Sequence, residues 1–135
     1  MSDGGLSSFQ RRMRAIPEAV RRAVGPSLVA AAEDVAEVQR ALAPVDEGEL
    51  RASIVVTGPG QSTPAYSQPG GAFAVPENAA AVTAGNSEVR YPHLQEFGTS
   101  FHPAHPFFWP GFRLRRKAAA AKIKRAIGKA VRAAK

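Results

Sequence analysis

Apolar residues recur at the spacing of an amphipathic helix through the first third of the chain. They are separated by four, three, four and four residues, at Phe9, Met13, Ile16, Val20 and Val24. This period predicts a helix from Leu6, which Pro17 should kink or restart. Residues 1–5 precede the pattern and are expected to be frayed.

A second helix is predicted after a break at Gly25 and Pro26, and Pro44 should end it near Leu42. Its inward face is expected to hold Leu28, Val35, Val38 and Leu42. Its outer face carries three acids, Glu33, Asp34 and Glu37.

Strand composition replaces helical spacing after Pro44. Asp46 and Gly48 favour a turn, and the β-branched run that follows predicts a strand at about 52–57.

The stretch at 58–71 consists almost entirely of Gly, Pro, Ser, Thr and Gln. Such a composition cannot build a core, so we expect a mobile loop or a hairpin tip. Short strands are predicted at about 72–75 and 79–84, followed by a turn at Asn86 and Ser87.

Aromatic residues are concentrated between Tyr91 and Phe112. This window holds five of the seven phenylalanines, the only tryptophan, all three histidines and four of the eleven prolines. Because large aromatics contribute most per residue to a core or an interface, the fold should close on this segment. A short helix is predicted at 92–97 with Gly98 as its left-handed cap, and an extended connector at 99–110.

A long basic helix is predicted to begin near Pro110 and to occupy 111–135. Lys and Arg cover most of it, and a thin apolar seam runs along one face, at Phe112, Ala119, Ile123, Ala126, Ile127, Ala130, Val131 and Ala134.

Composition limits the alternatives. A length of 135 residues is most simply one domain, 1–135, with a small core because aromatics are only 7% and much of the remainder is Ala. The absence of cysteine excludes disulfides, thiol catalysis and Cys-based zinc sites. No apolar run reaches the ~18 residues of a spanning helix, and the N-terminus does not resemble a signal peptide. We therefore expect a soluble protein without export.

The formal charge of +7 is unevenly distributed. Ten of the eighteen Lys and Arg residues follow Gly111, where no acid occurs, whereas Glu33 to Glu49 contains six acids and one Arg. This polarity suits a polyanionic partner or the acidic face of a neighbouring copy.

Candidate catalytic chemistry is sparse. No second carboxylate lies near Glu96 in the sequence, and Glu96 comes shortly before the Gly98 cap. This position favours a structural hydrogen bond or an intersubunit salt bridge. His93, Glu96, His102 and His105 do not have the spacing of a helix-borne zinc site. Without a nucleophile–base pair, phosphate loop or metal cage, we expect no enzyme, cofactor or metal.

Three separated blocks resemble the head–tail joining proteins of tailed phages, also called neck or tail-completion (tail terminator) proteins. They are residues 43–54, residues 91–99 ending in Glu-Phe-Gly-Thr, and residues 106–110 before a C-terminal helix. Glu47, Pro92 and Gly111 depart from the family pattern.

The resemblance implies an α+β subunit, with a small, mostly antiparallel sheet packed against N-terminal helices and a long C-terminal helix. It would form a sixfold homo-oligomeric ring at the head–tail junction of the virion, assembled in the bacterial host cytoplasm. Its partners would be a neck or connector protein, the tail tube protein and the DNA passing through the lumen. On this basis the assembly residues are expected to be Glu96, Phe97, Gly98, Thr99, Phe107, Phe108 and Trp109.

The charge pattern adds one inference of our own, in which Glu33, Asp34 and Glu37 meet the basic helix of a neighbouring copy. The aromatic cluster at Phe101 and 107–109 favours core or interface packing over base stacking, because basic residues are not interleaved with it. The basic helix is expected to have a surface or intersubunit role, ahead of DNA contact and of a position on lipid. The residues for such a DNA or partner contact are Arg113, Arg115, Arg116, Lys117, Lys122, Lys124 and Arg125.

The alternative function is a basic nucleic-acid-binding protein that acts through its C-terminal helix. In that case the charges at 113–135 would carry the activity, whereas in a junction protein the aromatic block would govern assembly.

Overall fold

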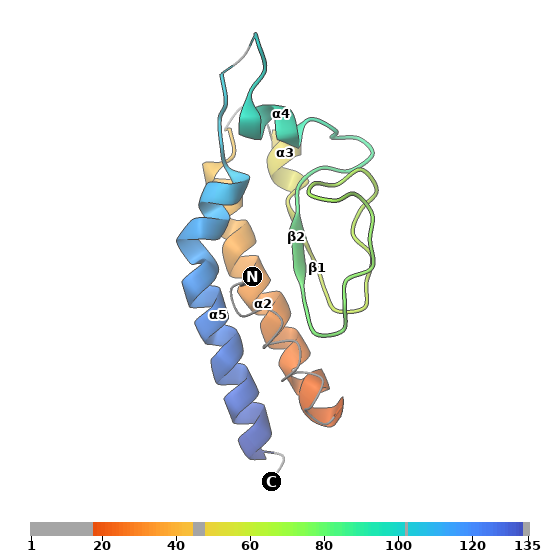
Figure 1. Cartoon of the computed structure of the whole chain (residues 1–135), viewed down its shortest axis with the longest axis vertical. Coiled ribbons are helices and arrows are strands. Elements are labelled where there is room, and N and C mark those ends of the chain that lie inside the picture. Colours follow the sequence, from red (N-terminus) through yellow and green to blue (C-terminus); the bar gives the residue numbers. More distant parts are fainter. Residues whose placement is uncertain (1–17, 45–47, 102, 134–135) are drawn as a thin grey trace, which may run out of the picture.

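Two long helices lie side by side and run antiparallel along the length of the molecule (Figure 1). The computed structural model describes residues 18–44, 48–101 and 103–133. The two helices are α2 (Glu18–Leu42) and α5 (Phe108–Ala133). The helix predicted from Leu6 to Pro17 and the fraying predicted for 1–5 lie outside the described residues.

The break predicted at Gly25 and Pro26 is wrong, because α2 continues through both residues. Pro26 is exposed, so the carbonyl left without its usual donor lies on the solvent side of the helix. Val38 and Leu42, predicted to face inward, are only half-buried. The buried stripe stays in phase on both sides of the proline, at Val20, Val24, Leu28, Ala31, Val35, Ala36 and Gln39. Tertiary packing of this stripe outweighs the local helix-breaking preference.

A small antiparallel sheet follows, formed by β1 (Val55–Thr57) and β2 (Ala81–Thr83), with Val56 opposite Val82. The strand predicted at 52–57 begins three residues late, because the preceding segment folds as a short helix, α3 (Gly48–Ala52). With its helices and this two-stranded sheet, the molecule has the predicted α+β class.

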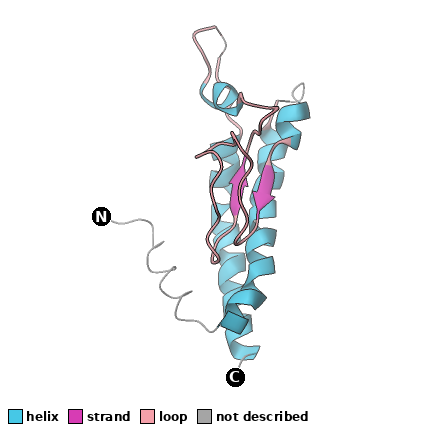
Figure 2. Cartoon of the chain, turned by 90° about the vertical axis from the view of Figure 1, so that its right-hand side faces the viewer, coloured by secondary structure: helices cyan, strands magenta, loops and turns pink. Residues whose placement is uncertain are grey.

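The chain between the two strands folds back on itself and lies beside the sheet (Figure 2). Backbone hydrogen bonds of 2.9 Å join its two limbs, from Gly60 to Val75 and from Thr63 to Phe73. Of the two alternatives predicted for 58–71, a mobile loop or a hairpin tip, this pairing with 73–75 fits the hairpin tip, and mobility stays a prediction.

The two Ala-rich strands predicted after this hairpin are only partly correct. Residues 72–75 contribute one isolated bridge, at Ala74, and the strand predicted at 79–84 is limited to β2. Alanine offers little side-chain surface for cross-strand packing, which explains the short ladders. The turn predicted at Asn86 is confirmed, since its side-chain oxygen accepts the backbone N–H groups of Glu88 and Val89.

The short helix α4 (Pro92–Phe97) has the predicted bounds. Gly98 follows it with the predicted positive φ, 75°, although its ψ of 179° is extended rather than left-handed helical. The chain then projects beyond the body of the molecule and returns to α5 (Figure 1). This last helix begins at Phe108 instead of near Pro110, which places the proline in the first turn, where a missing N–H is tolerated.

The core consists of two clusters along α2. The main cluster contains Leu50, Ile54, Phe107 and Phe108, and Phe107 is completely buried. The fold therefore closes on the aromatic segment as predicted, although only part of that segment is buried.

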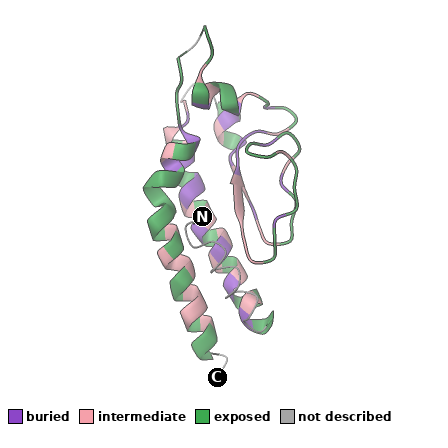
Figure 3. Cartoon of the chain, viewed as in Figure 1, coloured by how far each residue is buried: buried purple, intermediate pink, exposed green. Residues whose placement is uncertain are grey.

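The second cluster joins the other halves of α2 and α5. Val20, Val24 and Leu28 of α2 contact the half-buried Ile123, Ile127 and Ala130 of α5. Phe112 and Val131, predicted in this seam, are exposed, and Ala134 lies outside the described residues. Figure 3 shows the result, since α5 is half-buried toward α2 and exposed on its outer side.

Candidate assembly site

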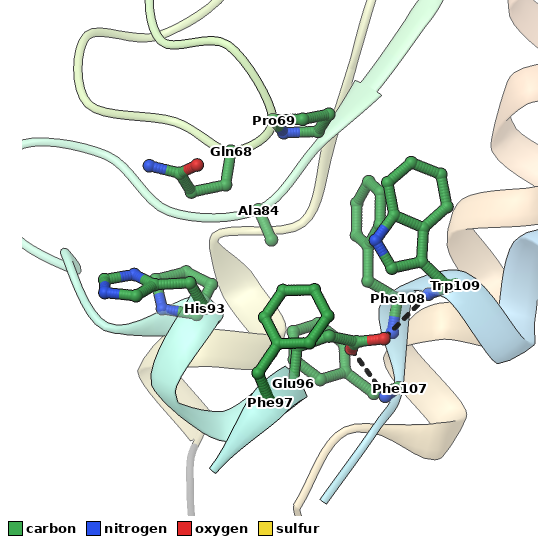
Figure 4. Close-up of a pocket in the computed structure, with 10 residues that line it drawn as sticks. Gln68, Pro69, Ala84, His93, Glu96, Phe97, Phe107, Phe108 and Trp109 are labelled. Carbon is green, nitrogen blue, oxygen red and sulfur yellow. Dashed lines mark hydrogen bonds between the residues drawn. The ribbon is translucent and has the colours of Figure 1, made fainter. Parts of the chain in front are cut away.

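A buried carboxylate joins α4 to the beginning of α5. One oxygen of Glu96 accepts the backbone N–H groups of Phe107 and Phe108 at 2.9 Å each, and its other oxygen accepts that of Trp109 at 3.2 Å (Figure 4). The first turn of a helix has N–H groups without partners in the helix, and its partial positive charge favours an anion there. Glu96 is therefore a cap supplied by another helix, which confirms the predicted structural hydrogen bond.

The next two residues leave no backbone N–H group of this first turn without a partner. Pro110 has no N–H to satisfy, and Gly111 donates to the carbonyl of Phe107 at 3.2 Å. Every backbone donor from Phe107 to Gly111 thus has a partner. Within the sequence Phe-Phe-Trp-Pro-Gly, the one carboxylate of Glu96 therefore accepts the three N–H groups that have no partner in the helix.

Local backbone geometry brings the two segments together. The N–H of Gly98 donates to Leu94 and ends α4, and the N–H of His105 donates to the carbonyl of Gln95 on the return of the connector. The connector residues 98–106 therefore leave from and return to the same end of α4, which places Phe107 beside Glu96.

A second contact fixes the start of α5 against α2. The Gln39 side chain is completely buried and donates through Nε2 to the carbonyl of Phe108 at 2.8 Å. A Cβ atom on Gly111 would lie 2.5 Å from Gln39 Cγ and 3.0 Å from its Cα, so only glycine permits this approach. The two helices are thus held in one register where they cross.

A pocket of about 70 Å³ lies between α4, the start of α5 and the chain beside β2. It is smaller than the ~300 Å³ from which ligand sites normally begin. Its lining is mainly aromatic and proline, with few polar groups (Figure 4), and consists of Gln68, Pro69, Ala84, Pro92, His93, Glu96, Phe97, Phe107, Phe108 and Trp109. This composition suits packing rather than catalysis.

Large apolar side chains are exposed at the same end of the molecule. Phe97 is 70% exposed and Phe101, on the projecting connector, is 88% exposed. Trp109 and Phe112 meet edge to face with ring centroids 6.0 Å apart, and both remain partly exposed. We call this set the apolar end surface: Leu94, Phe97, Phe101, Trp109 and Phe112.

The predicted assembly residues therefore divide into two groups. Glu96, Phe107 and Phe108 are buried and hold the end of the molecule together, whereas Phe97, Thr99 and Trp109 are exposed. Gly98 provides the turn between them. An assembly role for the exposed residues stays a prediction.

The three acids of α2 lie away from this end. Asp34 forms an ion pair with Lys122 of α5 in the same chain, and Glu33 lies 3.3 Å from Arg40. Glu37 is exposed and, among the described residues, forms no ion pair. The attraction predicted between the acidic and basic helices thus acts within one chain, and its intersubunit form stays a prediction.

The predicted DNA or partner residues are spread along α5. Lys122 is half-buried and paired, and the other six are exposed: Arg113, Arg115, Arg116, Lys117, Lys124 and Arg125. None of these cations pairs with Glu96, because its carboxylate accepts backbone N–H groups instead.

Sequence reasoning missed three residues that organise this region. Arg40 donates twice to the carbonyl of Ile54, at 2.8 and 3.1 Å, and ties α2 to the start of β1. Gln39 and Gly111 form the helix crossing described above. Gln39 could have been found as the single amide in an apolar stripe, four residues after Val35, and Gly111 as a glycine inside a helical pattern.

Neither a metal centre nor a membrane span is found in the part of the chain that the structure describes. No three His, Asp or Glu side chains are grouped there as metal ligands, and His102 lies outside it. None of the helices in residues 18–44, 48–101 and 103–133 combines the length and apolar character needed to cross a bilayer.

Fold and site together define a small α+β protein with a carboxylate-capped helix terminus and exposed aromatic side chains at the same end. A family model described as "Bacteriophage HK97-gp10, putative tail-component" matches residues 7–98. The chain belongs to this HK97-gp10-like family of phage tail components, which confirms the predicted relationship. No curated protein and no solved structure matches the chain.

Family membership indicates a structural component of the phage tail and hence of the virion. The matched region ends at residue 98, so the projecting connector and α5 lie beyond it.

Proposed function

We propose that this protein is a structural virion subunit of the head–tail junction of a long-tailed phage or phage-like particle. It forms a sixfold ring that completes the tail or joins it to the capsid connector and leaves a channel for DNA. Its neighbours are further copies of itself, a neck or connector protein and the tail tube protein. The ring assembles in the host cytoplasm and remains in the virion.

The observation that carries this proposal is the apolar end surface. Isolated apolar residues on a protein surface are ordinary, but several large ones at one end are typical of an interaction site. Here two phenylalanines, Phe97 and Phe101, are more than two-thirds exposed, and three further large side chains accompany them. Aromatic residues of this kind supply most of the binding energy in protein interfaces.

The support beneath this surface favours a preorganised contact. Glu96 and Gln39 fix the first turn of α5, so Trp109 and Phe112 lose little freedom on binding. Phe101 lies on a connector whose backbone is restricted by Pro103 and Pro106. The surface is therefore suited to binding a neighbour without reorganisation of the core.

The test is light scattering of the full chain over a micromolar concentration series, with negative-stain imaging of any large species. We expect closed rings with a central opening for the wild type. The double variant Phe97→Ser and Phe101→Ser should lose the large species while keeping the helical circular dichroism spectrum of the wild type, because both side chains are exposed in the subunit.

A control pair changes two exposed apolar residues elsewhere. Phe73→Ser with Val131→Ser changes two exposed residues outside the apolar end surface and should leave the rings intact. Equal loss of assembly in both double variants would refute the assignment of the surface. A wild type that is monomeric at every concentration would refute self-assembly into a ring.

A further inference from the structure

One side of α5 carries a row of basic side chains that face solvent. At 100° per residue, six of them fall within a sector of about 160°, opposite the seam that contacts α2. All six are exposed: Arg113, Lys117, Lys124, Arg125, Lys129 and Arg132. We call this set the basic outer face.

The protein itself does not neutralise this face. Residues 112–135 contain no Asp or Glu, and among the described residues the one ion pair made by α5 is that of Lys122 with Asp34, beside the seam. Elsewhere Glu18 and Glu33 are paired with arginines of α2. Glu96 is buried at the helix terminus, so it offers nothing to the basic outer face.

Further copies of the same chain add positive charge overall, whatever local ion pairs form between acidic and basic helices. Each copy carries a formal charge of +7, so self-association increases the total positive charge of the assembly. Clustering of like charge opposes association unless counterions or a polyanion accompany it. The charge balance therefore points to a partner that is itself strongly anionic.

The structure separates the anionic partners. A lipid surface is disfavoured, because Ile123 and Ile127, the apolar residues that would insert, are half-buried against Val24 and Leu28 of α2. Single-stranded nucleic acid is disfavoured, because binding sites for it interleave aromatic stacking residues with the cations. The basic outer face has no aromatic residue between Arg113 and Arg132.

The dimensions suit duplex DNA. The row from Arg113 to Arg132 spans 19 residues, or about 28 Å of helix, close to the ~34 Å of one turn of B-DNA. Its side chains are Arg and Lys with Ala between them, and it lacks the Asn and Gln residues that read adenine in the major groove. We propose that the basic outer face of α5 binds the phosphate backbone of duplex DNA without sequence preference.

This proposal goes beyond the junction role and does not depend on ring formation. Six phosphate contacts predict a slope of roughly −5 in log K against log salt concentration, and a loss of about 10³-fold in affinity between about 50 and 200 mM salt. The assay is fluorescence anisotropy of the full chain with two duplexes of unrelated sequence. We expect the same affinity for both.

Charge-matched variants locate the site. Lys117→Gln, Lys124→Gln and Arg125→Gln together remove three charges from the basic outer face, and the salt slope should fall by about 2.7, or 0.9 per lost contact. The control, Arg22→Gln, Arg51→Gln and Arg90→Gln, removes three charges from elsewhere and should keep the wild-type slope. Circular dichroism verifies that both variants retain their helices.

Three results would overturn the proposal. They are no binding at about 50 mM salt, equal losses in the two variants, and a wild-type affinity for polyglutamate that matches its affinity for DNA. The last would reassign the basic outer face to an acidic protein partner. Light scattering of the same variants reports ring assembly separately, so failure of DNA binding and failure of the junction role are distinguishable.

Discussion

Replacing Glu96 by Gln tests how much the capped helix terminus contributes to folding. The carboxylate accepts three backbone N–H groups at 2.9, 2.9 and 3.2 Å, in a residue that is almost completely buried. Glutamine keeps the shape but has one accepting oxygen, and its amide group would present a donor to the N–H groups of α5. At least one of the three contacts must therefore be lost.

The expected cost follows from the kind of contact. Hydrogen bonds to charged groups contribute about 1.5–3 kcal/mol each. A negative charge at a helix N-terminus adds up to about 2 kcal/mol in a partly buried site. Because the amide oxygen can still accept up to two of these bonds, we expect Glu96→Gln to lower the free energy of unfolding by about 2–4 kcal/mol. That is a large share of the roughly 5–15 kcal/mol typical of a folded domain.

Urea denaturation measures this difference, at a protein concentration where light scattering shows a single species, since assembly shifts apparent stability. With an m value of roughly 2 kcal/mol/M, the midpoint should fall by about 1–2 M. Hydrogen exchange should accelerate at the amides of Phe107, Phe108 and Trp109 before those in the middle of α2. The control is Glu88→Gln, an exposed carboxylate on the turn after β2, which should change stability by less than about 0.5 kcal/mol. A midpoint for Glu96→Gln no lower than that of Glu88→Gln would refute the capping argument.

Four further substitutions have expected signs and sizes. Gly111→Ala forces a methyl group into Gln39, and even with the gain in helix propensity it should destabilise the protein by about 1–2 kcal/mol. Gly128→Ala places its methyl group 3.4 Å from one flexible arginine atom and should stabilise the protein by about 0.5–1 kcal/mol. Opposite signs in thermal unfolding are required, and two stabilising glycine variants would contradict the close helix crossing. Ser53→Ala removes a buried hydroxyl that bridges α3 and the end of β2, at 2.6 and 2.9 Å, and should lower the unfolding free energy by about 1–3 kcal/mol in urea; an unchanged midpoint would mean that this bridge does not contribute. Lys122→Ala breaks a partly exposed ion pair and should cost less than about 1 kcal/mol, with the loss decreasing as salt is added; a loss independent of salt would point to packing of the lysine stem instead.

The sequence by itself determined the elements whose signals are local. The spacing of apolar residues predicted part of the buried stripe of α2 and of the half-buried seam of α5, because a side chain every three or four residues must face one side of a helix. The bounds of α4 follow from Pro92 at its start and Gly98 after its end, since each residue type has its own backbone preference. The three separated blocks likewise identified the family.

Only the tertiary structure decided which distant residues each local element contacts. Pro26 lies inside α2 because the stripe on both sides packs as one unit, a balance of free energies that no short window contains. Glu96 caps a helix that begins twelve residues later, and Gln39 contacts a carbonyl 69 residues away. Sequence spacing shows which face of an element is apolar, but the partner of a polar group depends on how distant segments are brought together. The acidic and basic helices illustrate the limit, because the sequence predicted their contact between neighbouring copies, which stays a prediction, whereas the ion pair of Asp34 with Lys122 within one chain was decided by the antiparallel packing of α2 and α5.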